Sequence, residues 1–340
     1  MTGPPIGAAA SLGSGTGPRR PLGPLALART TIDRAGNHRS DDAWVARAWA
    51  AAGTQVVVVQ GGQALVRFGG GQARLVLLPA GRAPDGPRTL LGVDQDGNAY
   101  FSVMAALPAD DPAAAGTGEH DRAQPAGLRQ AGALLDDRDA GLLTQAVALA
   151  NWHETHTHCP RCGSLTDPVQ SGHARVCRRD GSEHFPRTDP AVIMLVTDPD
   201  DRILLGRGPK WGERRMSILA GFVEPGESAE QTVVREVAEE TGIVVGDVRY
   251  LASQPWPLPQ SLMLGFWAQA AGGQRIQVDG VEIIEAHWFS RDELLQAIAA
   301  GELGLPASVS IAHRIIEAWY GAELPAGLIS PFSRPQAASS

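Results

Sequence analysis

The stretch GFVEPGESAEQTVVREVAEETGI, residues 221–243, constrains this 340-residue chain more than any other. Gly221 and the Pro-Gly pair that follows it are typical of a loop. Ser228, with Gln231 three residues later, forms a capping-box pattern that predicts the start of a helix. The residues that follow lack Gly and Pro, and Gly242 stands where a C-terminal cap is expected. The stretch therefore predicts a loop that runs into one well-capped helix.

Three carboxylates share one face of this predicted helix. Glu236, Glu239 and Glu240 are three and four residues apart, whereas Val233 and Val237 form an apolar stripe on the other side. Like charges crowded together are costly unless a cation neutralises them, and Mg²⁺ or Mn²⁺ prefers such oxygen ligands. The alternative is a solvated acidic face on a surface helix.

The full spacing of the stretch favours the metal site. It fills the fixed positions of the Nudix box, which are Gly221, Glu227, Arg235-Glu236-Val237, Glu239-Glu240 and Gly242-Ile243. A pattern of this length is far more specific than a short glycine motif. The chain thus resembles the Nudix hydrolases, and the resemblance implies Mg²⁺- or Mn²⁺-dependent cleavage of a diphosphate linked to a nucleoside.

Composition limits the other possibilities. The net charge of −8 argues against non-specific nucleic-acid binding through bulk electrostatics. The apolar runs are too short to span a membrane, and the first residues lack the pattern of a secretion signal, so we expect no membrane association. Three cysteines, two of them in Cys159-Pro-Arg-Cys162, suit a reducing cytoplasm and a metal site better than a disulfide framework.

Taken in order, the chain predicts an α+β protein. Short β-rich runs separated by glycine clusters lie between residues 55 and 104, residues 108–127 suggest a long loop, and residues 128–152 have a helical pattern. The predicted divisions are a disordered tail at 1–38, a β-rich N-terminal domain at 39–152 that ends in a helix, a zinc-ribbon-like insert at 153–186, a Nudix domain with an α/β/α sandwich at 187–322 and a tail at 323–340.

The insert contains a cysteine pattern that is typical of zinc-binding sites. Cys159 and Cys162 form one CxxC knuckle, and Cys177 lies where a second knuckle is expected, with Asp180 at its partner position. A structural Cys₃Asp zinc site is therefore predicted, since carboxylate oxygen also binds zinc. The rival fourth ligands are His173 and His184, with His156 and His158 close to the first knuckle. One alternative is a ribbon that has lost its metal. Another is a ribbon that binds nucleic acid, which has some support from its arginines, Arg161, Arg175, Arg178, Arg179 and Arg187.

A proline-rich array follows the Nudix box. Its residues are Gln254, Pro255, Trp256, Pro257, Leu258, Pro259, Gln260 and Ser261. The prolines predict a stiff, extended loop, Trp256 offers a flat face for a base or pyridine ring, and the polar side chains offer hydrogen bonds. The array SQPWPxPQS is similar to the signature of the NADH pyrophosphatases within the Nudix superfamily, although Leu258 replaces a phenylalanine.

This resemblance implies a set of site residues. The Mg²⁺ or Mn²⁺ ligands would be Glu236, Glu239, Glu240, Glu282 and the backbone carbonyl of Ala220, with Glu285 as a nearby alternative to Glu282. The array would contact the dinucleotide, as would the positions of Phe185, which replaces a family tyrosine, and Ala312. Arg235 would pair with a box glutamate and orient it.

The implied activity is hydrolysis of the diphosphate of NADH or NAD⁺ to AMP and nicotinamide mononucleotide. The divalent ions would neutralise charge on the diphosphate and activate a water, and Glu239 or Glu240 would accept its proton. Removal of the NAD cap from RNA, a homodimeric assembly and a cytoplasmic location are further expectations. The alternatives are hydrolysis of another nucleoside diphosphate derivative, such as ADP-ribose, and a non-catalytic nucleotide- or RNA-binding module.

Overall fold

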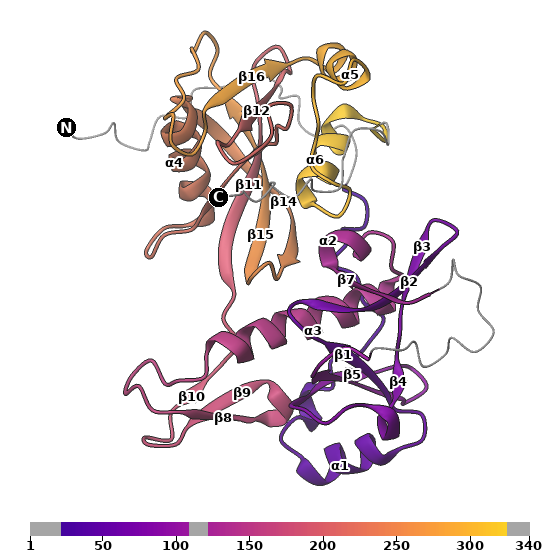
Figure 1. The fold of residues 1–340 in the computed structure, drawn as a ribbon. Helices are drawn as coiled ribbons and strands as arrows, with labels where there is room; N and C mark the ends of the chain where they lie inside the picture. Colours follow the sequence, from indigo (N-terminus) through magenta and orange to yellow (C-terminus); the bar gives the residue numbers. More distant parts are fainter. Residues whose placement is uncertain (1–21, 109–121, 325–340) are drawn as a thin grey trace, which may run out of the picture. The chain divides into compact units, whose positions relative to one another are not determined.

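The computed structural model describes residues 22–108 and 122–324. Within these ranges the chain forms two compact units, drawn in Figure 1. We call residues 190–254 and 263–324 the C-terminal unit, and residues 24–189 together with the segment 255–262 the N-terminal unit. None of the helices in the described ranges is both long and apolar enough to cross a membrane.

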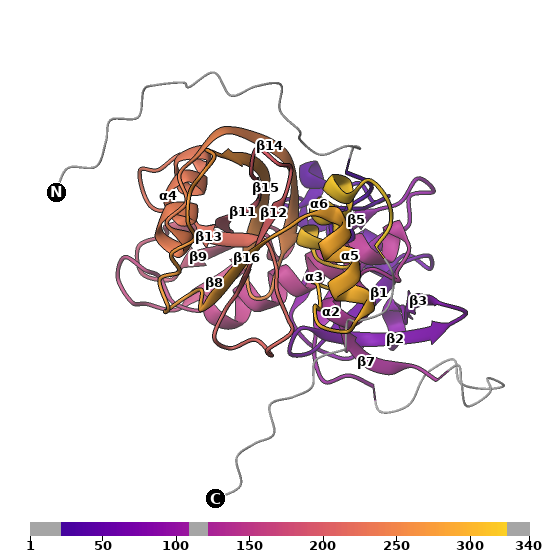
Figure 2. The ribbon, with the colours of Figure 1, turned by 90° about the horizontal axis from the view of Figure 1, so that it is seen from above.

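The C-terminal unit is built on one six-stranded sheet. Its strand order is β14-β15-β11-β12-β16, and β13 pairs with β11. The strands are β11 (Asp189–Thr197), β12 (Ile203–Arg207), β13 (Leu219–Phe222), β14 (Val245–Trp256), β15 (Ser261–Ala270) and β16 (Glu285–Phe289). Helix α4 (Ala229–Thr241) covers one face, and α5 (Arg291–Ala299) and α6 (Ile311–Tyr320) cover the other, as Figure 2 shows. This is the predicted α/β/α sandwich.

The core of this unit fixes α4 against the sheet. Val233 and Val237 are fully buried and pack among residues of β11 and β12 such as Met194 and Leu204. Burial of each such side chain contributes about 1.5–3 kcal/mol, so the apolar stripe holds the helix and its other face is left for the carboxylates.

Three small sheets lie in the described part of the N-terminal unit. One has the order β4-β1-β6-β5, another β3-β2-β7 and the third β10-β9-β8. Their strands are β1 (Gln55–Val59), β2 (Gln63–Gly69), β3 (Gln72–Leu75), β4 (Leu78–Pro79), β5 (Arg88–Val93), β6 (Ala99–Met104), β7 (Gln124–Gly127), β8 (Thr166–Val169), β9 (Ala174–Cys177) and β10 (Glu183–His184). The helices are α1 (Asp42–Ala50), α2 (Leu128–Ala131) and α3 (Asp137–Thr155).

The predicted helix at 128–152 is in fact two helices. Helix α2 ends at Gly132, and Asp136 starts α3 by accepting a hydrogen bond from the N–H of Asp139. Glycine interrupts the helix because it has little helical preference, and aspartate is a preferred N-cap. The predicted loop at 108–127 ends in strand β7, and its residues 109–121 lie outside the described ranges.

Part of the predicted N-terminal tail is packed. Leu25 and Leu27 are buried, and the guanidinium of Arg29 donates to the carbonyl oxygens of Gly132 and Leu135 and to the Asp137 carboxylate. The sequence did not indicate this because the contacts join segments about a hundred residues apart. Residues 1–21 and 325–340 lie outside the described ranges, whereas Leu324 in the predicted C-terminal tail is buried.

Candidate active site

Helix α4 is capped as the sequence predicts. The Ser228 side chain accepts the N–H of Gln231, whose side chain accepts the N–H of Ser228, and Gly242 ends the helix in the left-handed conformation at φ 69°. These contacts satisfy the free backbone groups at the helix ends and fix where the helix begins and stops.

Arg235 links three glutamates of the box. Its guanidinium donates to Glu227 at 2.7 and 2.9 Å, to Glu236 at 3.0 Å and to Glu239 at 3.0 Å. It also donates to the carbonyl oxygen of Phe222 at 3.0 Å. The hydrogen bonds from Arg235 lower the pKa of Glu227 to about 2. The predicted pairing of Arg235 with a box glutamate is confirmed, and it extends to more than one glutamate.

Three carboxylates meet where α4 approaches β13. Oxygens of Glu236, Glu240 and Glu282 lie within 4.8 Å of one another. Glu236 and Glu240 are buried, and Glu240 Oε2 has no hydrogen-bond partner in the described part of the chain. Burial, together with repulsion from Glu236 and Glu282, raises the pKa of Glu240 to about 8. A buried, partnerless oxygen among carboxylates fits a divalent cation, which would neutralise the cluster and complete its bonding.

A turn that begins at Asp279 brings Glu282 to this cluster, and the sequence reasoning above does not include it. The Asp279 carboxylate accepts the N–H groups of Glu282 at 3.0 Å and Ile283 at 2.9 Å, and its own N–H donates to the Glu240 carbonyl oxygen at 3.3 Å. Asp279 followed by Gly280 is the local signal that would have indicated such a turn.

The remaining predicted ligands are placed differently. Glu285 is engaged by Arg207 and by His287, so its side chain is turned to other partners. Glu239 is exposed and bound to Arg235, and it lies outside the group formed by Glu236, Glu240 and Glu282. Ala220 lies in β13, where it is the register partner of Ile193.

The proline-rich array forms the turn between β14 and β15, and other residues of the N-terminal unit hold its tip. Asn151 of α3 donates to the carbonyl oxygens of Pro257 at 3.0 Å and Pro259 at 2.9 Å. Gln260 donates to the Asp189 carboxylate at 2.8 Å. The Arg129 guanidinium lies 5.1 Å from the centre of the half-buried Trp256 ring. The array is thus the end of β14, a turn and the start of β15, held by hydrogen bonds from Asn151 and Gln260, and not the extended loop that its prolines predict.

Other predicted substrate contacts occupy varied environments. Gln254 is fully buried, and its amide donates to the Val309 carbonyl oxygen at 3.0 Å, so its hydrogen-bonding capacity is at least partly used within the protein. Ala312 is buried in the first turn of α6, whereas Phe185, after β10, is 61% exposed. Pro255, Leu258 and Ser261 are half-buried.

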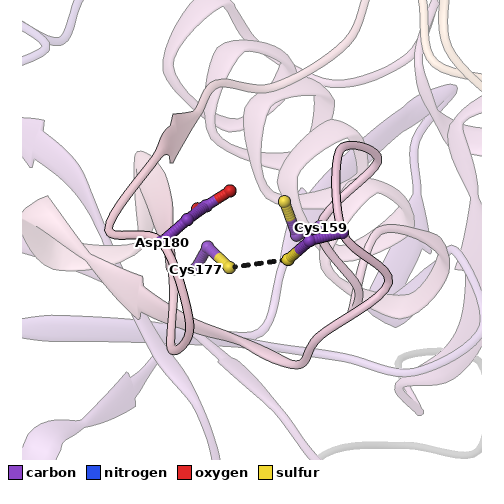
Figure 3. A group of neighbouring side chains, drawn as sticks. Cys159, Cys177 and Asp180 are labelled. Atoms are coloured by element: carbon purple, nitrogen blue, oxygen red, sulfur yellow. Dashed lines mark hydrogen bonds between the residues drawn. The ribbon is translucent and has the colours of Figure 1, made fainter.

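The four predicted zinc ligands meet in the ribbon, and Figure 3 shows Cys159, Cys177 and Asp180 converging. Ligand atoms of these three residues and of Cys162 lie within 4.8 Å of one another, and the Cys162 and Cys177 sulfurs are 3.4 Å apart. Burial would raise the pKa of Cys159, but hydrogen bonds from Ser182 and nearby backbone N–H groups lower it to about 6. Burial raises the pKa of Cys177 to about 11. A cation is needed for all three thiols to ionise together, so this donor set fits zinc.

The rival histidines lie outside the group of four. His173 is buried and its Nε2 is 2.7 Å from the Leu90 carbonyl oxygen. His184 bonds to the Ser182 hydroxyl, while His156 and His158 bond to the hydroxyls of their neighbouring threonines. The geometry therefore favours Asp180 as the fourth donor.

Comparisons with known proteins agree with this arrangement. Residues 187–307 match the family described as NUDIX domain, residues 154–185 the NADH pyrophosphatase zinc ribbon domain, and residues 53–152 the NADH pyrophosphatase-like rudimentary NUDIX domain. The chain is 41% identical over 309 residues to the NAD-capped RNA hydrolase NudC of Mycobacterium bovis, covering 87% of this chain and 95% of that protein. The chain belongs to the NADH pyrophosphatase family of Nudix hydrolases.

Further relatives of this NADH pyrophosphatase family member include the protein of the same description from Mycobacterium tuberculosis, which matches with the same identity and coverage. The NAD-capped RNA hydrolase NUDT12 of Pongo abelii is 41% identical over 197 residues, which cover 54% of this chain and 42% of that protein. A solved NUDIX hydrolase from Nitrosomonas europaea matches with a TM-score of 0.39 at 19% identity, over 49% of this chain and 95% of its own.

Membership in the NADH pyrophosphatase family also explains the N-terminal unit. The strand pattern of the sequence predicts a β-rich domain of no particular family, whereas residues 53–152 match a rudimentary NUDIX domain. The unit contains the long helix α3 and a parallel pairing of β1 with β6. This pairing joins residues 55–59 to residues 100–104, so no local sequence pattern indicates it. The chain is thus a Nudix hydrolase with a second, rudimentary NUDIX domain, and the ribbon lies between the two in the sequence.

Proposed function

We propose that this chain hydrolyses the diphosphate bond of NADH and NAD⁺, giving AMP and nicotinamide mononucleotide, and removes the NAD cap from RNA. The observation that supports this most directly is the partnerless Glu240 oxygen within the cluster of Glu236, Glu240 and Glu282 in the described part of the chain. Family membership supports NADH and NAD⁺ as substrates, and the description of the relatives as NAD-capped RNA hydrolases supports NAD-capped RNA.

Each residue of the cluster has a proposed role. Glu236, Glu240 and Glu282 would hold Mg²⁺ or Mn²⁺ together with the Ala220 carbonyl. Glu239, which shares Arg235 with Glu236, would be a further donor. When bound, the ion supplies charge neutralisation for the diphosphate and activation of water. Arg235 holds Glu236 and Glu239 in position. Glu239 or Glu240 accepts a proton from the attacking water.

Recognition of the dinucleotide is assigned to the proline-rich array. Trp256 would stack on the base or pyridine ring, because an aromatic face binds another flat ring regardless of its hydrogen-bonding pattern. The hydrogen bonds from Asn151 and Gln260 fix the turn that presents it. Phe185 and Ala312 remain proposed contacts with the substrate, and the buried amide of Gln254 would act chiefly by holding β14 to the Val309 backbone.

Zinc would be a closed structural site in this enzyme. Cys159, Cys162, Cys177 and Asp180 would supply four donors and leave no open position for catalysis. The ion would stabilise a small sheet that has little apolar core of its own. We further propose that the enzyme is a homodimer and works in the cytoplasm, where its three thiols would remain reduced.

The test is a substrate panel read by mass spectrometry. Purified protein is incubated with NADH, NAD⁺, ADP-ribose and an NAD-capped RNA, each with Mg²⁺ and with Mn²⁺. We expect AMP and nicotinamide mononucleotide from the dinucleotides, and RNA with a 5′-monophosphate from the capped RNA. Cleavage of ADP-ribose in preference to all the others would instead identify another nucleoside diphosphate derivative as the substrate. Light scattering at several concentrations measures the assembly.

A further inference from the structure

A basic loop with one exposed tryptophan lies in the C-terminal unit, and the catalytic cluster does not use it. It connects β12 to β13 and has the sequence GPKWGERRM, residues 208–216. Lys210, the only lysine of the chain, is followed by Trp211, Arg214 and Arg215. We propose that this loop, the KWGERR loop, binds the RNA that follows the NAD cap. This inference rests on the proposed activity toward NAD-capped RNA.

The KWGERR loop begins beside the proposed metal site. A Cβ on Gly208 would lie 3.2 Å from the carbonyl oxygen of Glu282, so the two backbones are adjacent. The carbonyl oxygen of Arg207 also accepts the N–H of Ile284 at 3.0 Å. A cap whose diphosphate is held at Glu282 therefore leaves the next nucleotides near this loop.

The side chains of the loop have the chemistry that single-stranded RNA requires. Trp211 is 37% exposed, and the Arg215 guanidinium lies 5.2 Å from the centre of its ring. Lys210 and Arg214 are exposed. Bases of any sequence stack on an aromatic side chain, while lysine and arginine contact the phosphates. This combination suits RNA bodies of differing sequence behind a common cap.

The loop is held in shape by a hydrogen bond within it and by hydrogen bonds to residues 301 and 304. The N–H of Trp211 donates to the Gly208 carbonyl oxygen at 3.1 Å, and the N–H of Met216 donates to that of Gly304 at 3.0 Å. The guanidinium of Arg214 donates to the Gly301 carbonyl oxygen at 3.2 Å, which fixes the direction of this side chain and uses one of its five N–H donors. A fixed loop loses less conformational entropy on binding than a mobile one.

The ribbon is the rival basic surface, but most of the arginines in and next to it are buried or paired with a carboxylate. Arg175 is buried, Arg178 is bonded to Asp167, and Arg187 is bonded to Asp189. Arg161 and Arg179 are exposed and provide the matched comparison. The KWGERR loop is therefore the better candidate within the described ranges, since it adds an aromatic face to its charges.

The experiment compares NADH with a short NAD-capped RNA on the same set of variants. The loop variants are Trp211→Ala and the double variant Lys210→Ala/Arg214→Ala. The control is Arg161→Ala/Arg179→Ala, which removes the same charge from the ribbon. We expect Trp211→Ala to lower kcat/KM for the capped RNA by roughly tenfold or more, because the stacking face is removed, while kcat/KM for NADH stays within about twofold. The double loop variant should also flatten the salt dependence for RNA, by about one unit of logarithmic slope for each phosphate that is no longer neutralised.

The possible outcomes separate this inference from the proposed function. Equal losses on NADH and on capped RNA, or no loss on either, would overturn the loop as the RNA-binding segment. A loss on RNA in the ribbon variant alone would assign RNA binding to the ribbon instead. Wild-type protein that cleaves NADH but not capped RNA would overturn the inference and leave the NADH activity standing, and wild-type protein inactive on both would overturn the proposed function with it.

Discussion

The carboxyl group of Glu236 lies against the Cα of Gly221. A Cβ built on Gly221 would be 1.9 Å from the Glu236 carboxyl carbon and 2.0 Å from its Oε1. The sequence predicts that Gly221 lies in a loop, and this prediction is wrong. Gly221 lies in β13, where it is the register partner of Val192. The glycine is required by the close approach of the glutamate to the strand, and so the strand and α4 together set the position of Glu236.

The first prediction follows from this close approach. Gly221→Ala should displace the Glu236 carboxylate and lower NADH turnover by on the order of a hundredfold, because a charged group that stabilises the transition state is moved. Affinity for Mn²⁺, measured by electron paramagnetic resonance, should fall with it. Gly246→Ala is the control, because a Cβ at that position of β14 would meet open space. Normal turnover in Gly221→Ala would show that Glu236 can move without consequence.

The second prediction concerns Glu240. Glu240→Gln keeps the shape of the side chain but removes the charge, and turnover should fall by on the order of a hundredfold or more, since a bound metal stabilises charge by several kcal/mol. Glu230→Gln, an exposed glutamate of the same helix, should leave turnover unchanged.

Thermal unfolding gives a second measurement for the Glu240 variant. Mg²⁺ should raise the melting temperature of the wild type by mass action and do so much less in Glu240→Gln. Full activity in that variant, with an unchanged response to the metal, would remove Glu240 from the metal site.

Local sequence explains some parts of this site well. The N-terminal cap of α4 joins Ser228 and Gln231, three positions apart, and spacing alone indicates it. The hydrogen bond from Arg235 to Glu239 joins residues four apart on the helix, whereas those from Arg235 to Glu227 and Phe222 join residues eight and 13 apart. The choice of Glu282 over Glu285 depends on Asp279 and on which partner Arg207 takes, and these are settled only when β12 and β16 pair. The contacts of Arg29 with Leu135 and Asp137, and the parallel pairing of β1 with β6, are likewise long-range contacts that no local pattern specifies.

The third prediction concerns Trp256. Trp256→Ala should weaken binding of NADH by about 1–3 kcal/mol because the stacking face is removed, while hydrolysis of a simple nucleoside diphosphate should suffer less. Trp256→Phe should recover part of the affinity, because it restores an aromatic face. KM and kcat on both substrates measure the effect. Equal losses on the two substrates would mean that Trp256 supports the turn with Arg129 and does not contact the second ring.

The fourth prediction concerns zinc. We expect one zinc per chain in protein purified without chelator, measured by elemental analysis. Asp180→Cys should slow the release of zinc to a colorimetric chelator, since thiolate is a stronger ligand than carboxylate. Asp180→Ala should weaken zinc binding by roughly tenfold or more.

Glu183→Ala is the control for the zinc prediction, because this exposed carboxylate of β10 is not part of the group of four donors. Turnover of NADH, which depends on Glu236 and Glu240, should change little in the Asp180 and Glu183 variants while zinc stays bound. A zinc content near zero in active wild-type protein would show that the ribbon folds without a metal.

The fifth prediction concerns acid stability. His173 is buried, and burial lowers its pKa to about 4 from an ordinary value of about 6.5. Between pH 6.5 and pH 4 the unfolded chain binds more protons at His173 than the folded protein does. The contribution of His173 to the free energy of unfolding is therefore fully present above its unfolded pKa of about 6.5 and is lost as the pH falls toward 4. The loss from pH 7 to pH 5 should be about 2 kcal/mol.

Comparison with His173→Gln isolates this effect, because glutamine does not titrate and its amide can still donate to the Leu90 carbonyl oxygen. Urea unfolding at pH 7 and pH 5 should show a flatter pH dependence for His173→Gln than for the wild type. His38→Gln, at an exposed histidine of the same unit, should retain the wild-type profile. Zinc release at low pH affects all three proteins alike, so it cancels in the difference. An identical acid loss in wild type and His173→Gln would show that His173 is protonated without cost in the folded protein.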